Sequence, residues 1–579
     1  MGLVKRNIKF LQLFILLFVG ACGFVSHVPD QRIPRLHPAT PGYLIGNCDN
    51  LATKLLHLEG LSIEALSTIP TGGVTFQGRA ISEHCLLRAK VYERTSPVDQ
   101  QTYAISFEMR LPKAWNGRFW YQGNGGLDGN VVPALGNLSG ESALEQGFVV
   151  LSSDAGHNAA QNPFFGLDPQ ARLDYGYQAV GKLVLLAREV IKVAYGRYPD
   201  RSYIGGCSNG GRHALVAASR YSQLFDGFVA GAPGLDLPLA ALANIWGAQK
   251  YATIATGDPR TPTGLGTAFT GQERATIAQA LLDRCDMLDG LKDGLVFDTH
   301  RCQVLFDLSR DIPTCVTSRD GNCLTQDQKE VLKEIFSGAK RGSGESFYAP
   351  FPFDTGITSQ GFAFWEFTAP LVLDSGAVAF VFQTPPASPI GFNGPEFALT
   401  ADVDRLLDSF YASVPPYNEA SMDFMNPLDR HNLDHLRNRG AKLLLYHGVS
   451  DPIFSVNHSI SWYSTLAGKY GGFEQVTSFA RLFTVPGMGH CSGGPSTDLF
   501  EPISAIVNWV EYGVAPEFLV ARTRPANLEL PPTWSPSRSR ILCPYPKIAI
   551  YAGGDPETYN SFRCINNPAI QPTGGGEEW

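Results

Sequence analysis

The stretch Gly206-Cys207-Ser208-Asn209-Gly210 constrains the fold more than any other part of the sequence. It is a G-x-S-x-G motif, in which flanking glycines allow a serine to occupy a tight turn between a strand and a helix. The preceding "RSYIGG" predicts a strand and the following "RHALVAASRY" predicts a helix. The alternative is a glycine-rich turn with a structural serine, because the chain contains 60 glycines. The strand–turn–helix context favours a nucleophilic serine.

The rest of the chain predicts an α/β-hydrolase fold with a large inserted lid domain. Short apolar runs such as "RFWYQGNGG", "GFVVLSSDAGH" and "FDGFVAGAPG" alternate with helical patterns, which is typical of a parallel α/β sheet. This alternation stops after Pro233 and returns at "AKLLLYHGVSDP". We therefore expect a signal peptide (1–22), a tether (23–45), a catalytic domain in two parts (46–235 and 426–579, the second with a disulfide-closed extension) and a lid (236–425).

A nucleophilic serine needs a histidine base and an acid that orients the base. In α/β-hydrolases the acid and then the histidine follow the serine along the chain, on loops at strand ends. Asp451 follows the predicted strand "KLLLYHG", and His490 follows "RLFTVPGMG". We predict that these two residues complete a catalytic triad with Ser208. Three further histidines are interpreted as structural: His157, His213 and His447.

Two backbone N–H groups are needed to stabilise the oxyanion that forms on the carbonyl. One is expected from Asn209, the residue after the serine. The other is expected from Gly125 or Gly126 in the early loop "QGNGG", which resembles the glycine-rich loop of esterases. The alternative for this loop is a plain glycine-rich turn.

The N-terminus indicates export. Lys5, Arg6 and Lys9 flank an apolar run that is too short to span a bilayer, and the run ends at "VGAC". This ending resembles a bacterial lipobox, with Cys22 as the lipidated first residue of the mature chain. The alternative is an ordinary secretory signal. The protein is then either anchored in the cell envelope or periplasmic, or else secreted.

Removal of Cys22 from the 11 cysteines leaves an even number, which in an oxidising compartment suggests five disulfides. Sequence alone does not fix their connectivity. The plausible pairs are Cys48/Cys85, Cys285/Cys302, Cys315/Cys323 and Cys543/Cys564. Cys207 and Cys491 remain, beside the predicted nucleophile and base. A disulfide between them would hold the two loops together, and a free Cys207 thiol is the alternative.

An acidic loop, "CDMLDGLKDGLVFDTHRC", places Asp286, Asp289 and Asp293 close together. Clustered carboxylates repel one another unless a cation lies among them, and oxygen ligands suit Ca²⁺. The spacing is not that of an EF-hand, and a solvated acidic loop is the alternative.

Five stretches together resemble the tannase/feruloyl esterase family, which also contains mono(2-hydroxyethyl) terephthalate hydrolase: "GCSNGGRHAL", "DGLKDGL", "YHGVSDPIFS", "PGMGHCSGG" and "CPYPKIAIYAGGD". The resemblance implies hydrolysis of aromatic-acid esters and a disulfide between Cys207 and Cys491. It also implies a structural Ca²⁺ in the lid, bound by the three aspartates and by the carbonyls of Leu291 and Leu295. Phe454 matches an aromatic residue that flanks the ester in some members. The lid sequence departs too far from the family for further residues to be matched.

The sequence therefore predicts an exported serine hydrolase that acts on small aromatic esters. The net charge of −8 and the absence of a basic stripe argue against a nucleic-acid partner, and membrane attachment would come only from a lipid on Cys22. The alternatives are another serine hydrolase such as a thioesterase or peptidase, a non-catalytic binding lipoprotein, and a calcium-dependent structural protein.

Overall fold

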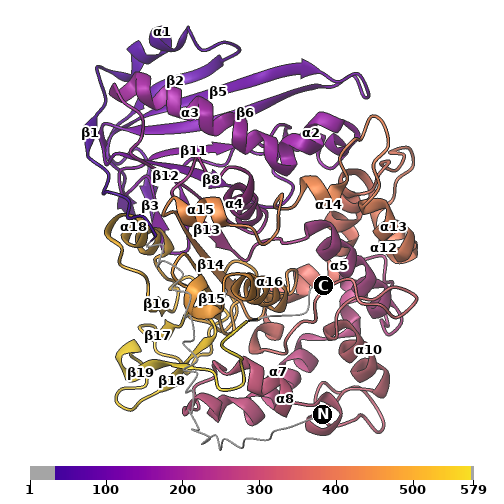
Figure 1. The fold of residues 1–579 in the computed structure, drawn as a ribbon. Coiled ribbons are helices and arrows are strands. Elements are labelled where there is room, and N and C mark those ends of the chain that lie inside the picture. Colours follow the sequence, from indigo (N-terminus) through magenta and orange to yellow (C-terminus); the bar gives the residue numbers. More distant parts are fainter. Residues whose placement is uncertain (1–32, 575–579) are drawn as a thin grey trace, which may run out of the picture. The chain divides into compact units, whose positions relative to one another are not determined.

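A computed structural model describes residues 33–574, and residues 34–574 lie in one compact unit. The unit is organised around a nine-stranded sheet in the order β15-β14-β13-β12-β8-β11-β6-β5-β2 (Figure 1). Neighbours from β15 to β11 are parallel, and the pairs β11–β6, β6–β5 and β5–β2 are antiparallel. The strands are β2 (Ser62–Ile69), β5 (His84–Thr95), β6 (Thr102–Pro112), β8 (Arg118–Gly123), β11 (Val149–Ser153), β12 (Arg201–Cys207), β13 (Gly227–Gly231), β14 (Lys442–Gly448) and β15 (Ala480–Val485).

The two parts of the sheet differ in burial, which explains their sequence patterns. Every residue of β13 and β14 is buried, so these strands are continuous apolar runs, as parallel strands covered on both faces are. Residues of β5 alternate between buried and more exposed positions over much of the strand, as expected when one face meets water. The predicted parallel sheet is therefore a mixed sheet, to which an antiparallel edge is added.

The helices that flank the sheet follow the predicted pattern. Helix α3 (Ala179–Tyr195) ends at Gly196, which adopts a left-handed conformation with φ of 76°. Helix α4 (Asn209–Arg220) packs against β8, β12 and β13. Helix α16 (Val456–Lys469) contacts β14 and β15, whereas α18 (Pro502–Tyr512) contacts β13 and β14.

Residues 232–441, here called the insertion, connect β13 to β14 and supply no strand to this sheet. Their helices gather at one side of the sheet in Figure 1 and share a hydrophobic core with Tyr103, Phe165 and Tyr175 of the α/β part. The insertion, which contains the predicted lid 236–425, is therefore packed onto the sheet domain. Its longer helices are α5 (Leu237–Ala252), α7 (Gly271–Cys285), α8 (Thr299–Leu305), α10 (Gln326–Phe336), α11 (Gln360–Phe367), α12 (Gly394–Thr400) and α13 (Val403–Phe410).

The N-terminal segment that was predicted to be a tether is fixed to the domain over its described part. Strand β1 (Gly42–Tyr43) pairs with β7 (Ala114–Trp115). The amides of Ala39 and Thr40 donate to the carboxylates of Glu511 and Asp200, at 2.8 and 2.7 Å. Residues 34–45 are therefore anchored, not free. The predicted signal peptide and Cys22 lie outside the described residues, and none of the described helices has the length and apolarity needed to cross a bilayer.

The C-terminal extension contacts both the sheet and the acidic loop of the insertion. It contains the pairs β16 (Leu519–Arg522) with β17 (Ser539–Leu542) and β18 (Lys547–Tyr551) with β19 (Phe562–Asn566). The amide of Tyr545 donates to the carbonyl of Leu482 in β15 at 2.7 Å. Arg540 forms an ion pair with Asp293, and Arg538 donates to the Asp293 carbonyl at 2.7 Å. The extension thus connects the insertion to the edge of the sheet.

Residues 33–574 contain five disulfides, and they are the five pairs considered from the sequence. Cys207 and Cys491 are joined across 284 residues with their Cα atoms 5.9 Å apart, which excludes the free Cys207 thiol. The other bonds are Cys48–Cys85, Cys285–Cys302, Cys315–Cys323 and Cys543–Cys564.

The backbone around the G-x-S-x-G motif is packed so tightly that only glycine fits. A Cβ atom on Gly206 would lie 2.4 Å from the Gly123 carbonyl oxygen at the end of β8, and one on Gly210 would lie 2.3 Å from the same atom. Both distances are far below a van der Waals contact, and the atom in the way belongs to a sheet strand. The motif glycines therefore allow the end of β8 to contact the start of α4.

This contact predicts that Gly210→Ala destabilises the fold by about 1–3 kcal/mol, because overpacked sites strain the backbone. Gly247→Ala in α5 is the matched control, since its Cβ would meet no atom within 4 Å. That variant should be neutral or stabilised by roughly 0.5–1 kcal/mol through the better helix propensity of alanine. Urea unfolding measures both, and equal stabilities of the two variants would contradict the steric argument.

Candidate active site

Ser208 occupies a strained turn between β12 and α4. Its φ and ψ are 65° and −131°, a conformation that L-residues rarely adopt and that is concentrated at functional sites. Its amide donates to the Gly231 carbonyl at 3.0 Å, and its side chain forms no helix-capping hydrogen bond. The half-buried Ser208 side chain is therefore not engaged in capping the helix.

Asp451 and His490 form the predicted acid–base pair. His490 Nδ1 lies 2.8 Å from Asp451 Oδ2, so the protonated Nδ1 donates to the carboxylate and leaves Nε2 able to act as a base. Asp451 is fully buried, and its Oδ1 accepts the amides of Ile453 and Phe454, each at 3.0 Å. Burial alone would raise the pKa of Asp451, but the neighbouring His490 and His447 hold that pKa below its usual value.

His447 supports Asp451 from behind. Its Nε2 lies 2.9 Å from the Phe454 carbonyl oxygen and 3.3 Å from Asp451 Oδ2, and its Nδ1 lies 2.8 Å from Ser459 Oγ. With Nε2 protonated, both ring nitrogens have partners, so His447 has no free nitrogen for substrate. The sequence interpretation of His447 as a structural residue agrees with these contacts.

The disulfide Cys207–Cys491 joins the turn of Ser208 to the loop of His490, because each of these predicted catalytic residues adjoins one of its cysteines. His490 Nε2 is buried and has no hydrogen-bond partner among the described residues, and no hydrogen bond joins it to Ser208. Catalytic hydrogen bonds are often long without substrate and shorten when it binds. The His490 ring also packs edge-on against Phe454 and Trp365, with ring centroids 5.2 and 5.0 Å away.

The predicted oxyanion-hole residues surround Ser208. Asn209 is the first residue of α4, and N–H groups in a first helical turn have no intrahelical acceptor. A Cβ atom on Gly125 would lie 3.8 Å from Ser208 Cβ, and Gly126 lines the same cavity as Ser208. These positions fit an oxyanion hole. They do not distinguish Gly125 from Gly126 as the residue whose backbone N–H is the second donor.

A buried polar network holds Asn209 in place. Asn209 Nδ2 donates to Asp128 Oδ2 at 2.8 Å, and Asp128 Oδ2 also contacts His213 Nε2 at 2.9 Å. Burial and the nearby Arg212 charge lower the pKa of His213 well below its usual value, so this ring stays neutral. His157 is also engaged, through Nε2 to Asn162 Oδ1 at 2.9 Å. Neither histidine competes with His490 as the base.

A narrow cavity lies at Ser208, with walls from both the sheet domain and the insertion. Its volume is about 40 Å³, which is much less than the roughly 300 Å³ at the lower end of ligand pockets, so an acyl group enters only if side chains move. The predicted Phe454 lines it. The sequence did not identify the walls that the insertion supplies: Leu237, Ala241, Trp365, Leu373, Asp374, Ala377 and Phe382. Two π-helical segments, η8 (Pro370–Asp374) and η9 (Ala377–Phe382), carry most of them, and such segments are frequent at functional sites.

Asp374 is the one charged side chain that lines this cavity. It is 4% exposed, and its Oδ2 accepts from Asn244 Nδ2 at 3.2 Å. Burial raises the pKa of Asp374 to about 7, although the hydrogen bond from Asn244 lowers it. A lone aspartate in the apolar run "LVLDSGAVAFVF" was the available signal, since aspartate is rarely buried without a role.

The acidic loop has the oxygen donor atoms that a hard cation needs, but its three aspartates do not all converge on one point. Asp286 and Asp289 form no ion pair with a described residue, and their oxygens accept backbone N–H groups. Burial, followed by the charges of Asp293 and Asp286, raises the pKa of Asp289 to about 8. Asp293 instead pairs with Arg540. Among the described residues, no three His, Cys, Asp or Glu side chains meet as a metal centre.

The predicted carbonyl ligands lie on the same loop. The amide of Leu291 donates to Asp289 Oδ1, and the amide of Leu295 donates to Asp293 Oδ1, each at 3.2 Å. Oxygen donors and two unpaired carboxylates fit Ca²⁺, whereas the pairing of Asp293 with arginine does not.

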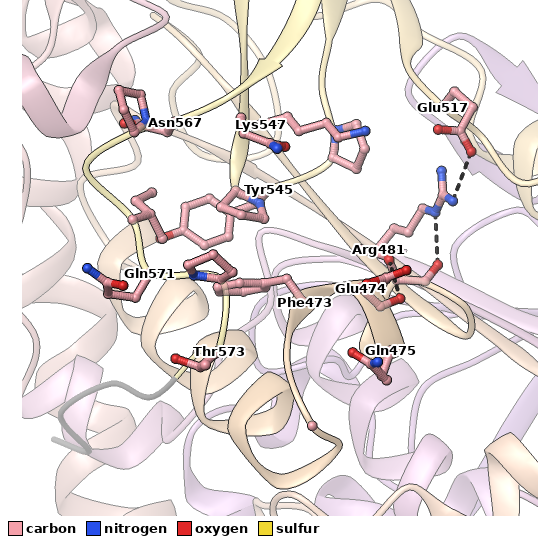
Figure 2. Close-up of a pocket in the computed structure, with 18 residues that line it drawn as sticks. Phe473, Glu474, Gln475, Arg481, Glu517, Tyr545, Lys547, Asn567, Gln571 and Thr573 are labelled. Carbon is pink, nitrogen blue, oxygen red and sulfur yellow. Dashed lines mark hydrogen bonds and ion pairs between the residues drawn. The ribbon is translucent and has the colours of Figure 1, made fainter. Parts of the chain in front are cut away.

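A larger cavity of about 730 Å³ lies elsewhere, between the C-terminal extension and residues 471–481 (Figure 2). Phe473 and Tyr545 meet edge-on in it with ring centroids 5.6 Å apart, and Arg481 pairs with Glu517 at 3.0 Å. No serine, cysteine or histidine lines it. The larger volume of this cavity is therefore no reason to assign it as the catalytic site.

Comparisons with known proteins agree with this geometry. The family model described as "Tannase and feruloyl esterase" matches residues 89–565. A mono(2-hydroxyethyl) terephthalate hydrolase from Piscinibacter sakaiensis is 34% identical over 543 residues, which cover 85% of this chain and 87% of that protein. A probable feruloyl esterase B-2 from Neosartorya fischeri is 28% identical over 488 residues, which cover 80% and 84%.

Two solved structures share the fold. Feruloyl esterase B from Aspergillus oryzae superposes with a TM-score of 0.70 at 25% identity, covering 90% of this chain and 99% of that one. A tannin acyl hydrolase from Aspergillus niger superposes with a TM-score of 0.65 at 20% identity, covering 91% and 97%. The chain therefore belongs to the tannase and feruloyl esterase family, and it is a carboxylic ester hydrolase with an α/β-hydrolase fold.

Proposed function

We propose that this hydrolase cleaves esters of hydroxybenzoic- or hydroxycinnamic-type acids through an acyl-enzyme on Ser208. The observation that carries the proposal is the His490–Asp451 pair, 2.8 Å apart, tied by the Cys207–Cys491 disulfide to the turn that presents Ser208. The aromatic side chains of Trp365, Phe382 and Phe454 around the cavity support an aromatic acyl group. The related feruloyl esterase is named for a hydroxycinnamic ester, and the related mono(2-hydroxyethyl) terephthalate hydrolase is named for another aromatic-acid ester.

The reaction then follows from the positions of these groups. His490 Nε2 takes the proton of Ser208 as Oγ attacks the ester carbonyl, and Asp451 stabilises the resulting imidazolium. The oxyanion accepts hydrogen bonds from the Asn209 amide and from the amide of Gly125 or Gly126. His490 returns the proton to the departing alcohol. Water, activated by the same histidine, then releases the aromatic acid and restores Ser208.

The triad assignment predicts that Ser208→Ala lowers kcat by at least ~10³-fold while the protein stays folded. Ser219→Ala on the same helix is the control and should retain full activity. Hydrolysis of methyl ferulate, methyl gallate, mono(2-hydroxyethyl) terephthalate, an aliphatic ester, a thioester and a peptide would be measured. Full activity of Ser208→Ala would refute the triad. Cleavage of only the thioester or the peptide would favour those hydrolase classes, and no cleavage by the wild type would favour a binding protein.

We also propose that the acidic loop binds a structural Ca²⁺. The two carboxylates of Asp286 and Asp289 that lack a cationic partner support this, as do the neighbouring carbonyls of Leu291 and Leu295. The ion would supply the positive charge that these carboxylates lack, and it would stabilise the fold without taking part in the chemical step.

Metal removal is expected to lower the melting temperature by several degrees, with recovery on addition of Ca²⁺ but not of Mg²⁺. Asp289→Asn should abolish this response, whereas Asp283→Asn on the exposed face of α7 should keep it. The measurement is differential scanning calorimetry of EDTA-treated protein, with metal content checked by elemental analysis. An unchanged melting temperature in metal-free protein would argue against the site.

The five disulfides are typical of a protein that folds outside the reducing cytoplasm. We propose further that the exported chain is anchored by a lipid on Cys22, which rests on the "VGAC" sequence. Wild-type protein is then expected in the detergent phase of a phase-separation experiment and Cys22→Ser in the aqueous phase. Recovery of the wild type in the aqueous phase would leave an ordinary secretory signal.

A further inference from the structure

Asp374 is a buried carboxylate that the proposed chemistry does not use. It ends the π-helical segment η8 and lines the cavity that also contains Ser208. Its Oδ2 accepts one hydrogen bond, from Asn244, and its Oδ1 accepts none from the described residues. No lysine, arginine or histidine of the described part of the chain pairs with it. A carboxylate in an apolar site is costly unless its lone pairs find donors, so the cavity contains an acceptor without its donor.

The other side chains around the cavity supply no positive charge for the Asp374 carboxylate. Most of them are apolar or aromatic, and no basic residue is among them. Tyr175, Trp365, Ser208 and Asn209 in the lining carry donor groups, but none of them is hydrogen-bonded to Asp374, and the Tyr175 hydroxyl already donates to the Gly126 carbonyl at 3.2 Å. A molecule that enters the cavity can therefore supply the donor that Asp374 Oδ1 lacks.

We propose that Asp374 determines which acyl group is accepted, by binding a free hydroxyl on the aromatic ring and by disfavouring a ring that carries a second carboxylate. The inference rests on the function proposed above and narrows it to esters of phenolic acids. A phenolic O–H is a strong donor that can reach a carboxylate from within an apolar slot. It also satisfies the carboxylate without adding charge to the cavity.

The same geometry separates this chain from its relative named for mono(2-hydroxyethyl) terephthalate. The acyl part of that ester carries a second carboxylate on the ring. Above pH 7, where Asp374 is mostly ionised, this second carboxylate would face Asp374 with no cation among the lining residues to neutralise either group, and repulsion between like charges is strong where water is excluded. The two acyl groups are similar in size, so charge and hydrogen bonding, not shape, make the distinction.

The test compares methyl esters that differ at one ring position, in both the benzoate and the cinnamate series. The substituents are hydrogen, hydroxyl and methoxy at the 3- and 4-positions, and monomethyl terephthalate supplies the carboxylate. For the wild type we expect kcat/KM to be about 10- to 100-fold higher for the best hydroxyl ester than for its methoxy counterpart, the range expected when a charged acceptor loses its partner. Monomethyl terephthalate should be the poorest substrate.

Two variants then identify the responsible residue. Asp374→Leu should lose the preference for hydroxyl over methoxy, while hydrolysis of the unsubstituted ester shows that the catalytic groups still work. Asp374→Asn keeps the shape and removes the charge, so it should retain part of the preference and cleave monomethyl terephthalate at least ~10-fold faster than the wild type. Glu396→Gln, an exposed carboxylate on α12 that is outside the cavity, is the control and should match the wild type throughout.

The outcomes separate this inference from the proposed function. If the wild type cleaves no aromatic ester, or if Ser208→Ala cleaves them equally well, the proposed function itself fails. If the wild type cleaves them without distinguishing hydroxyl from methoxy, or prefers monomethyl terephthalate, only the role of Asp374 is refuted. The role is likewise refuted if Asp374→Leu keeps the wild-type preference.

Discussion

Direct backbone contact between the end of β8 and the start of α4 determines where everything else in the active site lies. Gly123, Gly206 and Gly210 approach so closely that no side chain fits between them. The contact places the loop that carries Gly125 and Gly126 beside Ser208, so one packing interaction positions the nucleophile and both predicted oxyanion donors. The strained conformation of Ser208 is maintained because the sheet strands on either side cannot move apart.

The sequence predicted the parts of the fold that depend on local pattern. The buried parallel strands, α3 with its glycine terminus, the turn at Ser208 and the pairing of Asp451 with His490 all follow from apolar periodicity and from strand-end position. The antiparallel edge of β2, β5 and β6 was less evident, because solvated strands alternate between polar and apolar residues and carry no signal of their partners. The anchoring of residues 34–45 depends on distant groups such as Asp200 and Glu511, which no local pattern reveals.

The walls of the cavity were the hardest part to predict. Trp365, Asp374 and Phe382 come from a segment whose π-helical turns depart from the 3.6-residue period on which helix patterns depend. Their arrangement is set by tertiary packing of the insertion, and their roles follow from contacts with residues far away in sequence. In the function proposed here, substrate preference would therefore depend on the region in which sequence periodicity is least informative. The acidic loop also depends on distant residues, because Arg540 of the C-terminal extension forms an ion pair with Asp293, one of its three aspartates.

The Cys207–Cys491 disulfide has a consequence for where the enzyme can work. Its two cysteines are 284 residues apart, so the bond forms only after most of the chain has been made. In a reducing cytoplasm both thiols stay free, and the serine turn and the histidine loop are then held only by noncovalent packing. Oxidation in an exported chain would join them and fix the position of one loop relative to the other. The disulfide therefore makes the geometry around Ser208 and His490 depend on the redox state of the compartment that contains the enzyme.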